Sequence, residues 1–104
     1  MIRWQTAISY PGKTTNNQAE YMTLIAGLRS ILFDCRALGI DPLETTLEVF
    51  SDSQLVVNQV NGRWKMKNAE LRKLQAEATK LLGQCRSWEL SWHPRSESVR
   101  ILGH

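Results

Sequence analysis

The chain has 104 residues, with 13 Lys and Arg against 10 Asp and Glu, and a formal net charge of +3 at pH 7. This length fits one small domain, and a composition of 42% apolar and 22% charged residues excludes an intrinsically disordered chain. No apolar run approaches the roughly 20 residues of a membrane span, and the first residues lack the apolar core of a signal peptide. We therefore expect a single domain over residues 1–104 with no membrane partner.

The charges are divided unevenly along the chain. Residues 1–52 carry four basic and six acidic side chains, whereas residues 53–104 carry nine basic and four acidic ones. An acidic half joined to a basic half is typical of a cation site next to a surface for an anionic polymer. Ordinary scatter of surface charge is the simpler explanation of the same counts.

The two cysteines, Cys35 and Cys85, have neither metal-ligand spacing nor the pattern of a disulfide framework. Both occupy apolar positions of helical patterns. We expect buried free thiols, and therefore a reducing, cytoplasmic location.

The first third of the chain predicts a strand and a long helix. Apolar residues alternate over 2–10, which is typical of a strand, and Pro11-Gly12 ends it. Two capping boxes compete for the start of the helix, one beginning at Thr15 and one at Asn17, and Gly39 ends it. The predicted apolar stripe of this helix comprises Met22, Ile25, Leu28, Leu32, Cys35 and Leu38.

The rest of the chain predicts two more strands and two more helices. In chain order these are a strand over 47–50, a short helix over 54–60, a basic loop over 63–67, a long helix capped by Asn68 and ending near Leu82, and a strand over 88–92. Strands that alternate with helices indicate an α/β domain with some parallel pairing. The lone first strand is expected at an edge of the sheet or in an antiparallel pair.

Two carboxylates stand out by position. Glu20 falls in the first turn of the first helix, and Asp52 follows the second strand, where α/β sheets place their ligands. Two such acids facing each other form a site for a hard cation such as Mg²⁺. Structural roles compete with this hypothesis: Glu20 completes a capping box from Asn17, and Asp52 caps the helix after it.

Longer motifs surround both acids. Residues 14–21 (TTNNQAEY) and 51–60 (SDSQLVVNQV), followed by 62–68 (GRWKMKN) and the end of the last strand at 92–95 (WHPR), closely resemble the type 1 ribonuclease H family. The resemblance extends from roughly residue 4 to residue 97. It implies a ribonuclease H-like α/β fold, a mixed sheet with flanking helices. It also implies the family activity, metal-dependent endonucleolytic cleavage of the RNA strand of an RNA–DNA hybrid.

The resemblance assigns roles to eight residues of this chain. The expected catalytic and metal-binding residues are Glu20 and Asp52, and the expected substrate-binding residues are Asn16, Asn17, Gln54, Trp64, Lys65 and Lys67. The amides match positions that touch nucleotides in the minor groove, where an amide both donates to and accepts from a ribose 2′-OH. Trp64 and the lysines match positions that contact the DNA strand. The competing roles are a turn residue for Asn16, a surface amide for Gln54 and a plug over the core for Trp64.

The chain departs from the family at both ends. The central first strand with its Asp-Gly pair is missing, and the last residues contain no aspartate at the position of the final ligand, Glu97 being the nearest acid. His93 and His104 are expected to be surface residues. With two of four carboxylates, one Mg²⁺ or Mn²⁺ ion at most is expected to bind well, because two ions close together need more negative charge. We expect a swapped homodimer, a partner chain or a local rearrangement to replace the missing strand.

Three functions remain open on this basis. The chain is part of a metal-dependent endoribonuclease, a catalytically degenerate module that binds nucleic acid, or a protein-interaction module that retains inherited motifs.

Overall fold

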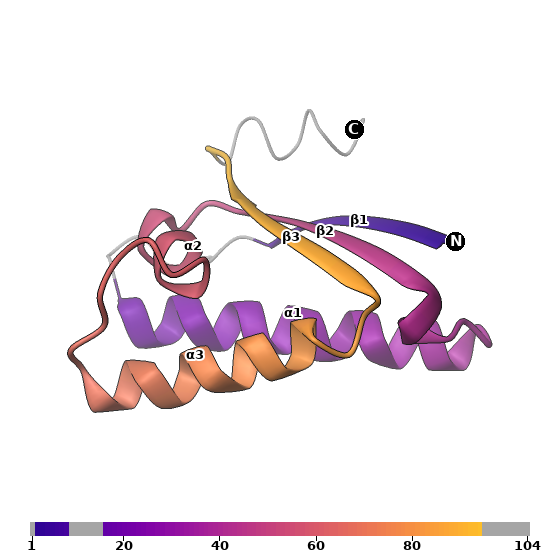
Figure 1. Cartoon of the computed structure of the whole chain (residues 1–104), viewed down its shortest axis with the longest axis horizontal. Coiled ribbons are helices and arrows are strands. Elements are labelled where there is room, and N and C mark those ends of the chain that lie inside the picture. Colours follow the sequence, from indigo (N-terminus) through magenta and orange to yellow (C-terminus); the bar gives the residue numbers. More distant parts are fainter. Residues whose placement is uncertain (1, 9–15, 95–104) are drawn as a thin grey trace.

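The computed structural model describes residues 2–8 and 16–94, which form a small sheet with helices packed beneath it (Figure 1). In chain order the elements are β1 (Ile2–Ile8), α1 (Asn17–Ala37), the 3-10 turn η1 (Pro42–Glu44), β2 (Thr45–Ser51), α2 (Gln54–Val60), α3 (Ala69–Leu82) and β3 (Ser87–Trp92). The predicted α/β class and element order are confirmed, with η1 the one element not expected. The predicted positions Tyr10, Pro11-Gly12, Thr15, Glu97 and His104 lie outside the described residues.

The sheet has the order β1-β2-β3, and both pairings are parallel. The predicted edge position of β1 is confirmed, whereas the antiparallel pairing considered for it is wrong. A mixed sheet also needs an antiparallel strand, and the described residues contain none. The strands are parallel because each connection between them contains helix, which carries the chain back so that the next strand runs in the same direction. β1 pairs directly with β2, so within the described residues no strand separates them.

The core lies between the sheet and the two long helices. Figure 1 shows α1 and α3 side by side below the sheet. Leu47 and Val49 of β2 are buried on this face, while Thr46, Glu48 and Phe50, which alternate with them, are half-buried. Such alternation is what a strand with one covered face produces. The other buried apolar residues are Tyr21, Leu24, Ile25, Leu28, Ile31, Leu32, Cys35, Val56, Val57, Val60, Leu71, Ala78, Leu82, Cys85 and Leu90.

The predicted stripe of α1 is wrong at its two ends. Met22 is 60% exposed and Leu38 is 69% exposed, whereas Tyr21 and Leu24 are fully buried. Leu38 is the C-cap of α1 and no longer part of the helix. Met22 falls about 120° around the helix from the buried centre at Leu28, since each residue adds about 100°. The tertiary contacts therefore select a face rotated from the one we predicted.

The helix starts also correct the sequence-based expectations. Asn16 is the N-cap of α1, where its Oδ1 accepts from the backbone N–H of Ala19 at 3.0 Å, so the capping box from Asn17 is wrong. Ser53, not Asp52, is the N-cap of α2. A cap needs a non-helical backbone and a short acceptor that reaches back to the third amide, and in both cases an adjacent residue meets these conditions. The predicted cap of α3 at Asn68 is confirmed.

Cys35 and Cys85 are buried and free, as predicted. Burial raises the pKa of both thiols. Among the described residues, no helix combines the length and apolar character needed to cross a bilayer.

Candidate active site

The carboxyl end of β2 meets the first turn of α1 through one hydrogen bond. Ser53 Oγ donates to Glu20 Oε2 at 3.0 Å, across 33 positions of sequence. The same Oγ accepts from the backbone N–H of Val56 at 3.3 Å, so one hydroxyl both caps α2 and holds Glu20. Since Ser53 directly follows Asp52, this bond brings the Glu20 carboxylate to the end of β2. Because Asn16 and not Asn17 is the N-cap, Glu20 does not have the position that a capping box with Asn17 requires.

Several further contacts hold the backbone around Asp52. The Ser53 N–H donates to Ser51 Oγ at 3.1 Å, which closes a tight turn at the strand end. On the neighbouring strand, Trp92 Nε1 donates to the carbonyl oxygen of Asp52 at 3.3 Å, and the His93 N–H donates to the carbonyl oxygen of Ser51 at 3.0 Å. The Asp52 side chain is half-buried. These contacts fix the backbone position of Asp52 at the end of β2.

Glu20 and Asp52 both lie at the carboxyl end of β2. Over residues 2–8 and 16–94, no group of three or more His, Cys, Asp or Glu side chains is arranged to hold a metal ion. Mg²⁺ is commonly bound by one or two carboxylates, with water and substrate phosphate completing an octahedron. Glu20 and Asp52 are carboxylates of the kind that such a site uses. A pair of ions needs more anionic ligands than the described residues provide.

The three amides expected at the substrate surface lie around this end of the sheet. Asn16 and Asn17 start α1, and Gln54 starts α2. The Asn16 Oδ1 atom is engaged as the cap, which leaves its Nδ2 group to donate. Gln54 is exposed, and Asn17 is half-buried. Asn16 thus has a structural role as a helix cap, not as the turn residue considered for it, and its remaining donor is compatible with a substrate contact.

Trp64, Lys65 and Lys67 lie in the connection between α2 and α3, and all three are exposed. Figure 1 shows this connection at the same end of the molecule as α2 and the start of α1. The N–H groups of Arg63 and Trp64 donate to the carbonyl oxygen of Asn58 at 2.8 and 3.2 Å, which holds the beginning of the loop on α2. With 45% of its surface exposed, Trp64 is not a plug over the core.

Sequence reasoning missed two sets of residues that support the site. Ser53 is one, although a serine just before a helix is a standard capping signal. The other is a chain of hydrogen bonds through Gln59: Tyr21 Oη donates to Gln59 Oε1 at 2.8 Å, and Gln75 Nε2 donates to the Gln59 carbonyl oxygen at 2.7 Å. This chain ties α1, α2 and α3 together one residue away from Glu20. Burial raises the pKa of Tyr21 above its usual value, so its hydroxyl stays a donor even at alkaline pH.

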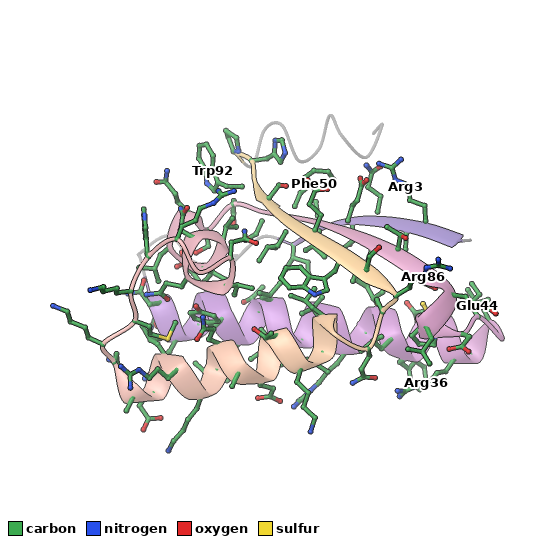
Figure 2. The ribbon with its side chains drawn as sticks, viewed as in Figure 1. Arg3, Arg36, Glu44, Phe50, Arg86 and Trp92 are labelled. Carbon is green, nitrogen blue, oxygen red and sulfur yellow. The ribbon has the colours of Figure 1, made fainter. Side chains whose placement is uncertain are left out.

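His93 lies at the end of β3, where its ring meets the Phe50 ring edge-on with centroids 4.7 Å apart. Figure 2 shows Phe50 on the face of the sheet away from α1 and α3. Residues Thr46 and Glu48 share this face with Phe50, since the side chains of a strand alternate. His93 therefore packs against the strand on this face, which agrees with a surface role.

Comparison with known proteins gives one family. The model of the family described as "Reverse transcriptase-like" matches residues 2–100. The chain is 44% identical over 88 residues to the bifunctional protein Rv2228c of Mycobacterium tuberculosis, covering 85% of this chain and 22% of that protein. It is 36% identical over 89 residues to ribonuclease HI of Halobacterium salinarum, covering 86% of this chain and 41% of that protein. The chain therefore spans less than half the length of these relatives.

Solved structures agree with these matches. The N-terminal RNase H domain of Rv2228c superposes with a TM-score of 0.65 at 43% identity, over 85% of this chain and 61% of that one. The RNase H1 of Halobacterium salinarum gives a TM-score of 0.66 at 36% identity, over 86% and 61% of the two chains. LC11-RNase H1, solved in complex with an RNA/DNA hybrid, superposes with a TM-score of 0.65 at 30% identity, over 88% of this chain and 64% of that one.

Proposed function

The chain belongs to the reverse transcriptase-like family in its type 1 ribonuclease H form, and from this we propose that it binds RNA–DNA hybrids. The binding surface is the end of the molecule where α1 and α2 begin. The observation that carries the proposal is the Ser53–Glu20 hydrogen bond, because it brings two family-type carboxylates to one sheet end. A similar solved protein holding a hybrid supports the choice of ligand.

Each part of this surface has a chemical role in the proposal. Asn17 and Gln54 contact ribose hydroxyls in the minor groove, since amides pair with a group that both donates and accepts. Lys65 and Lys67 attract the phosphates of the DNA strand without regard to sequence, and Trp64 packs against its sugars. A Mg²⁺ or Mn²⁺ ion held by Glu20 and Asp52 would supply positive charge to the RNA backbone.

The family activity that we assign is metal-dependent endonucleolytic hydrolysis of the RNA strand. Two carboxylates support one ion, and the in-line reaction relies on a pair of ions that stabilise the attacking and leaving oxygens. The described residues on their own therefore favour binding over cleavage. This observation supports the second candidate function, a catalytically degenerate module. Such a module binds hybrids, or it binds other proteins if hybrid binding is absent.

We also propose that the sheet is completed by another strand. β1 lies at one edge of the described sheet, and its outer edge is bonded to no other described strand. The edge of β3 is different, because Asn61 Nδ2 donates to the Leu90 carbonyl oxygen at 2.9 Å. A strand from a second copy or from a partner chain would pair with β1, since free edges template such pairing. Sedimentation tests this: a monodisperse monomer at all concentrations argues against a homodimer.

One experiment separates the functions. A fluorescent RNA–DNA hybrid is incubated with the chain in Mg²⁺, in Mn²⁺ and in EDTA, and both anisotropy and cut RNA are measured. Cleavage that Glu20→Gln and Asp52→Asn each abolish supports the enzyme. Salt-dependent binding that persists in EDTA without cut RNA supports the binding module. Absence of both contradicts hybrid recognition. The buried free thiols fit the cytoplasmic location proposed for either function.

A further inference from the structure

A cavity of about 340 Å³ lies between α2 and β3. It shares Gln54 with the candidate active site and reaches the backbone of Asp52 through Trp92, and its further lining residues include Val57, Asn58, Arg63 and Leu90. Its volume is at the small end of the range of roughly 300–1,000 Å³ found for small-molecule sites. The cavity is therefore large enough for one small organic ligand.

The aromatic part of the lining suits a flat ring. Val57 and Leu90 line the cavity but are almost fully buried, so they offer a ligand little apolar surface. Beside them, Trp92 is 43% exposed and its indole is held by the hydrogen bond from Nε1 to the Asp52 carbonyl oxygen at 3.3 Å. Figure 2 shows Trp92 at the end of β3, near α2. An anchored indole with part of its surface accessible is a platform on which a nucleobase stacks.

The charge of the lining suits an anion. Arg63 is exposed, forms no ion pair with any described residue, and its backbone is fixed by its N–H bond to the Asn58 carbonyl oxygen at 2.8 Å. No carboxylate lines the cavity. A guanidinium without a competing acid binds phosphate oxygens in a bidentate manner.

Two amides supply the remaining polar groups. Asn58 Nδ2 donates to the Gln54 carbonyl oxygen at 2.8 Å, which leaves its Oδ1 to accept from a ligand. The Gln54 side chain is exposed at the rim. Donors and acceptors of this kind match the edge of a nucleobase, so the cavity combines a stacking surface, a polar edge and a cation.

We propose that this cavity binds a nucleotide, with its base stacked on Trp92 and its phosphate at Arg63. The nucleotide comes from one of two sources: a free mononucleotide, or a single-stranded extension of a bound hybrid. The second source rests on the proposed function, because it places the extension next to the hybrid at Gln54. The first source does not depend on hybrid binding.

The probes are adenosine 5′-monophosphate, adenosine and inorganic phosphate, titrated into the ¹⁵N-labelled chain. We expect the monophosphate to shift the Trp92 indole and Arg63 amide resonances, with weaker binding of the two fragments. Trp92→Leu removes the stacking surface, and Arg63→Gln removes the charge. Each should weaken binding by about tenfold. Arg86→Gln is the matched control, since Arg86 precedes β3 at the opposite end (Figure 2), and should leave affinity unchanged within about twofold.

A second arm compares a blunt hybrid with one that carries a short single-stranded extension. Tighter binding of the extended hybrid, lost in Arg63→Gln, identifies the strand as the source. Nucleotide binding without hybrid binding supports the cavity and contradicts the proposed function. Blunt-hybrid binding with neither nucleotide shifts nor an advantage from the extension overturns the cavity and leaves the proposed function standing.

Discussion

Replacing Ser53 with alanine removes the single hydroxyl on which the site depends. The change deletes the cap of α2, which costs about 1 kcal/mol, and the hydrogen bond to Glu20. A hydrogen bond to a charged group contributes roughly 1.5–3 kcal/mol when fully buried. Because Glu20 is half-buried and regains water, we expect about 1 kcal/mol from this bond. The unfolding free energy should fall by about 2 kcal/mol, which lowers the urea midpoint by about 1.5 M.

Urea titrations followed by far-UV circular dichroism measure this loss. Asn68→Ala is the matched control, because Asn68 caps α3 through the N–H groups of Glu70 and Leu71 and contacts no carboxylate of the site. It should cost about 1 kcal/mol. A double-mutant cycle between Ser53→Ala and Glu20→Ala should give a coupling of about 1 kcal/mol. If Ser53→Ala and Asn68→Ala lower the unfolding free energy equally, and the effects of Ser53→Ala and Glu20→Ala are additive, the hydrogen bond between Ser53 and Glu20 is refuted.

Three further predictions concern the buried hydroxyl, alkaline pH and the basic loop. Tyr21→Phe leaves the buried Oε1 of Gln59 without its hydrogen-bond donor, so the unfolding free energy measured in urea titrations should fall by about 1–3 kcal/mol. An unchanged urea midpoint contradicts the hydrogen bond between Tyr21 and Gln59. Burial raises the folded-state pKa of Cys35, Cys85 and Tyr21 above their unfolded values of 9.0 and 10.0. Each neutral group therefore stabilises the fold fully at pH values below its unfolded pKa, and this stabilisation is lost as pH rises further. The urea midpoint should fall as pH rises above 9, and a midpoint that stays constant from pH 8 to 10.5 argues against this. Lys65→Gln combined with Lys67→Gln should reduce the slope of log K against log salt for hybrid binding by about 2, measured by anisotropy, and an unchanged slope removes both from the phosphate contacts.

Local patterns were enough to predict most elements. The bounds of α2 agree with the prediction at both ends, since Asn61-Gly62 breaks the helix and Gly62 adopts a φ of 77°. The end of α1 just before Gly39, which has a φ of 75°, and the cap at Asn68 follow from local preferences of the same kind. These features depend on a few consecutive residues, which is why the sequence alone predicts them.

Choices between adjacent candidates were decided by the tertiary structure. Asn16 rather than Asn17 caps α1, and Ser53 rather than Asp52 caps α2. Both pairs contain two good capping residues, so local chemistry does not discriminate between them. Which one caps depends on where the chain enters the helix from the sheet, and that is a property of the packed fold.

The sequence by itself singled out Glu20 and Asp52 by position, and its resemblance to the type 1 ribonuclease H family added Asn16, Asn17 and Gln54 as expected substrate contacts. Only the tertiary structure decided what Glu20 contacts, because its partner Ser53 is 33 positions away. It also decided that β1 pairs in parallel with β2. Both outcomes depend on contacts between distant segments, which are set by the packing of α1 against the sheet and leave no trace in local periodicity.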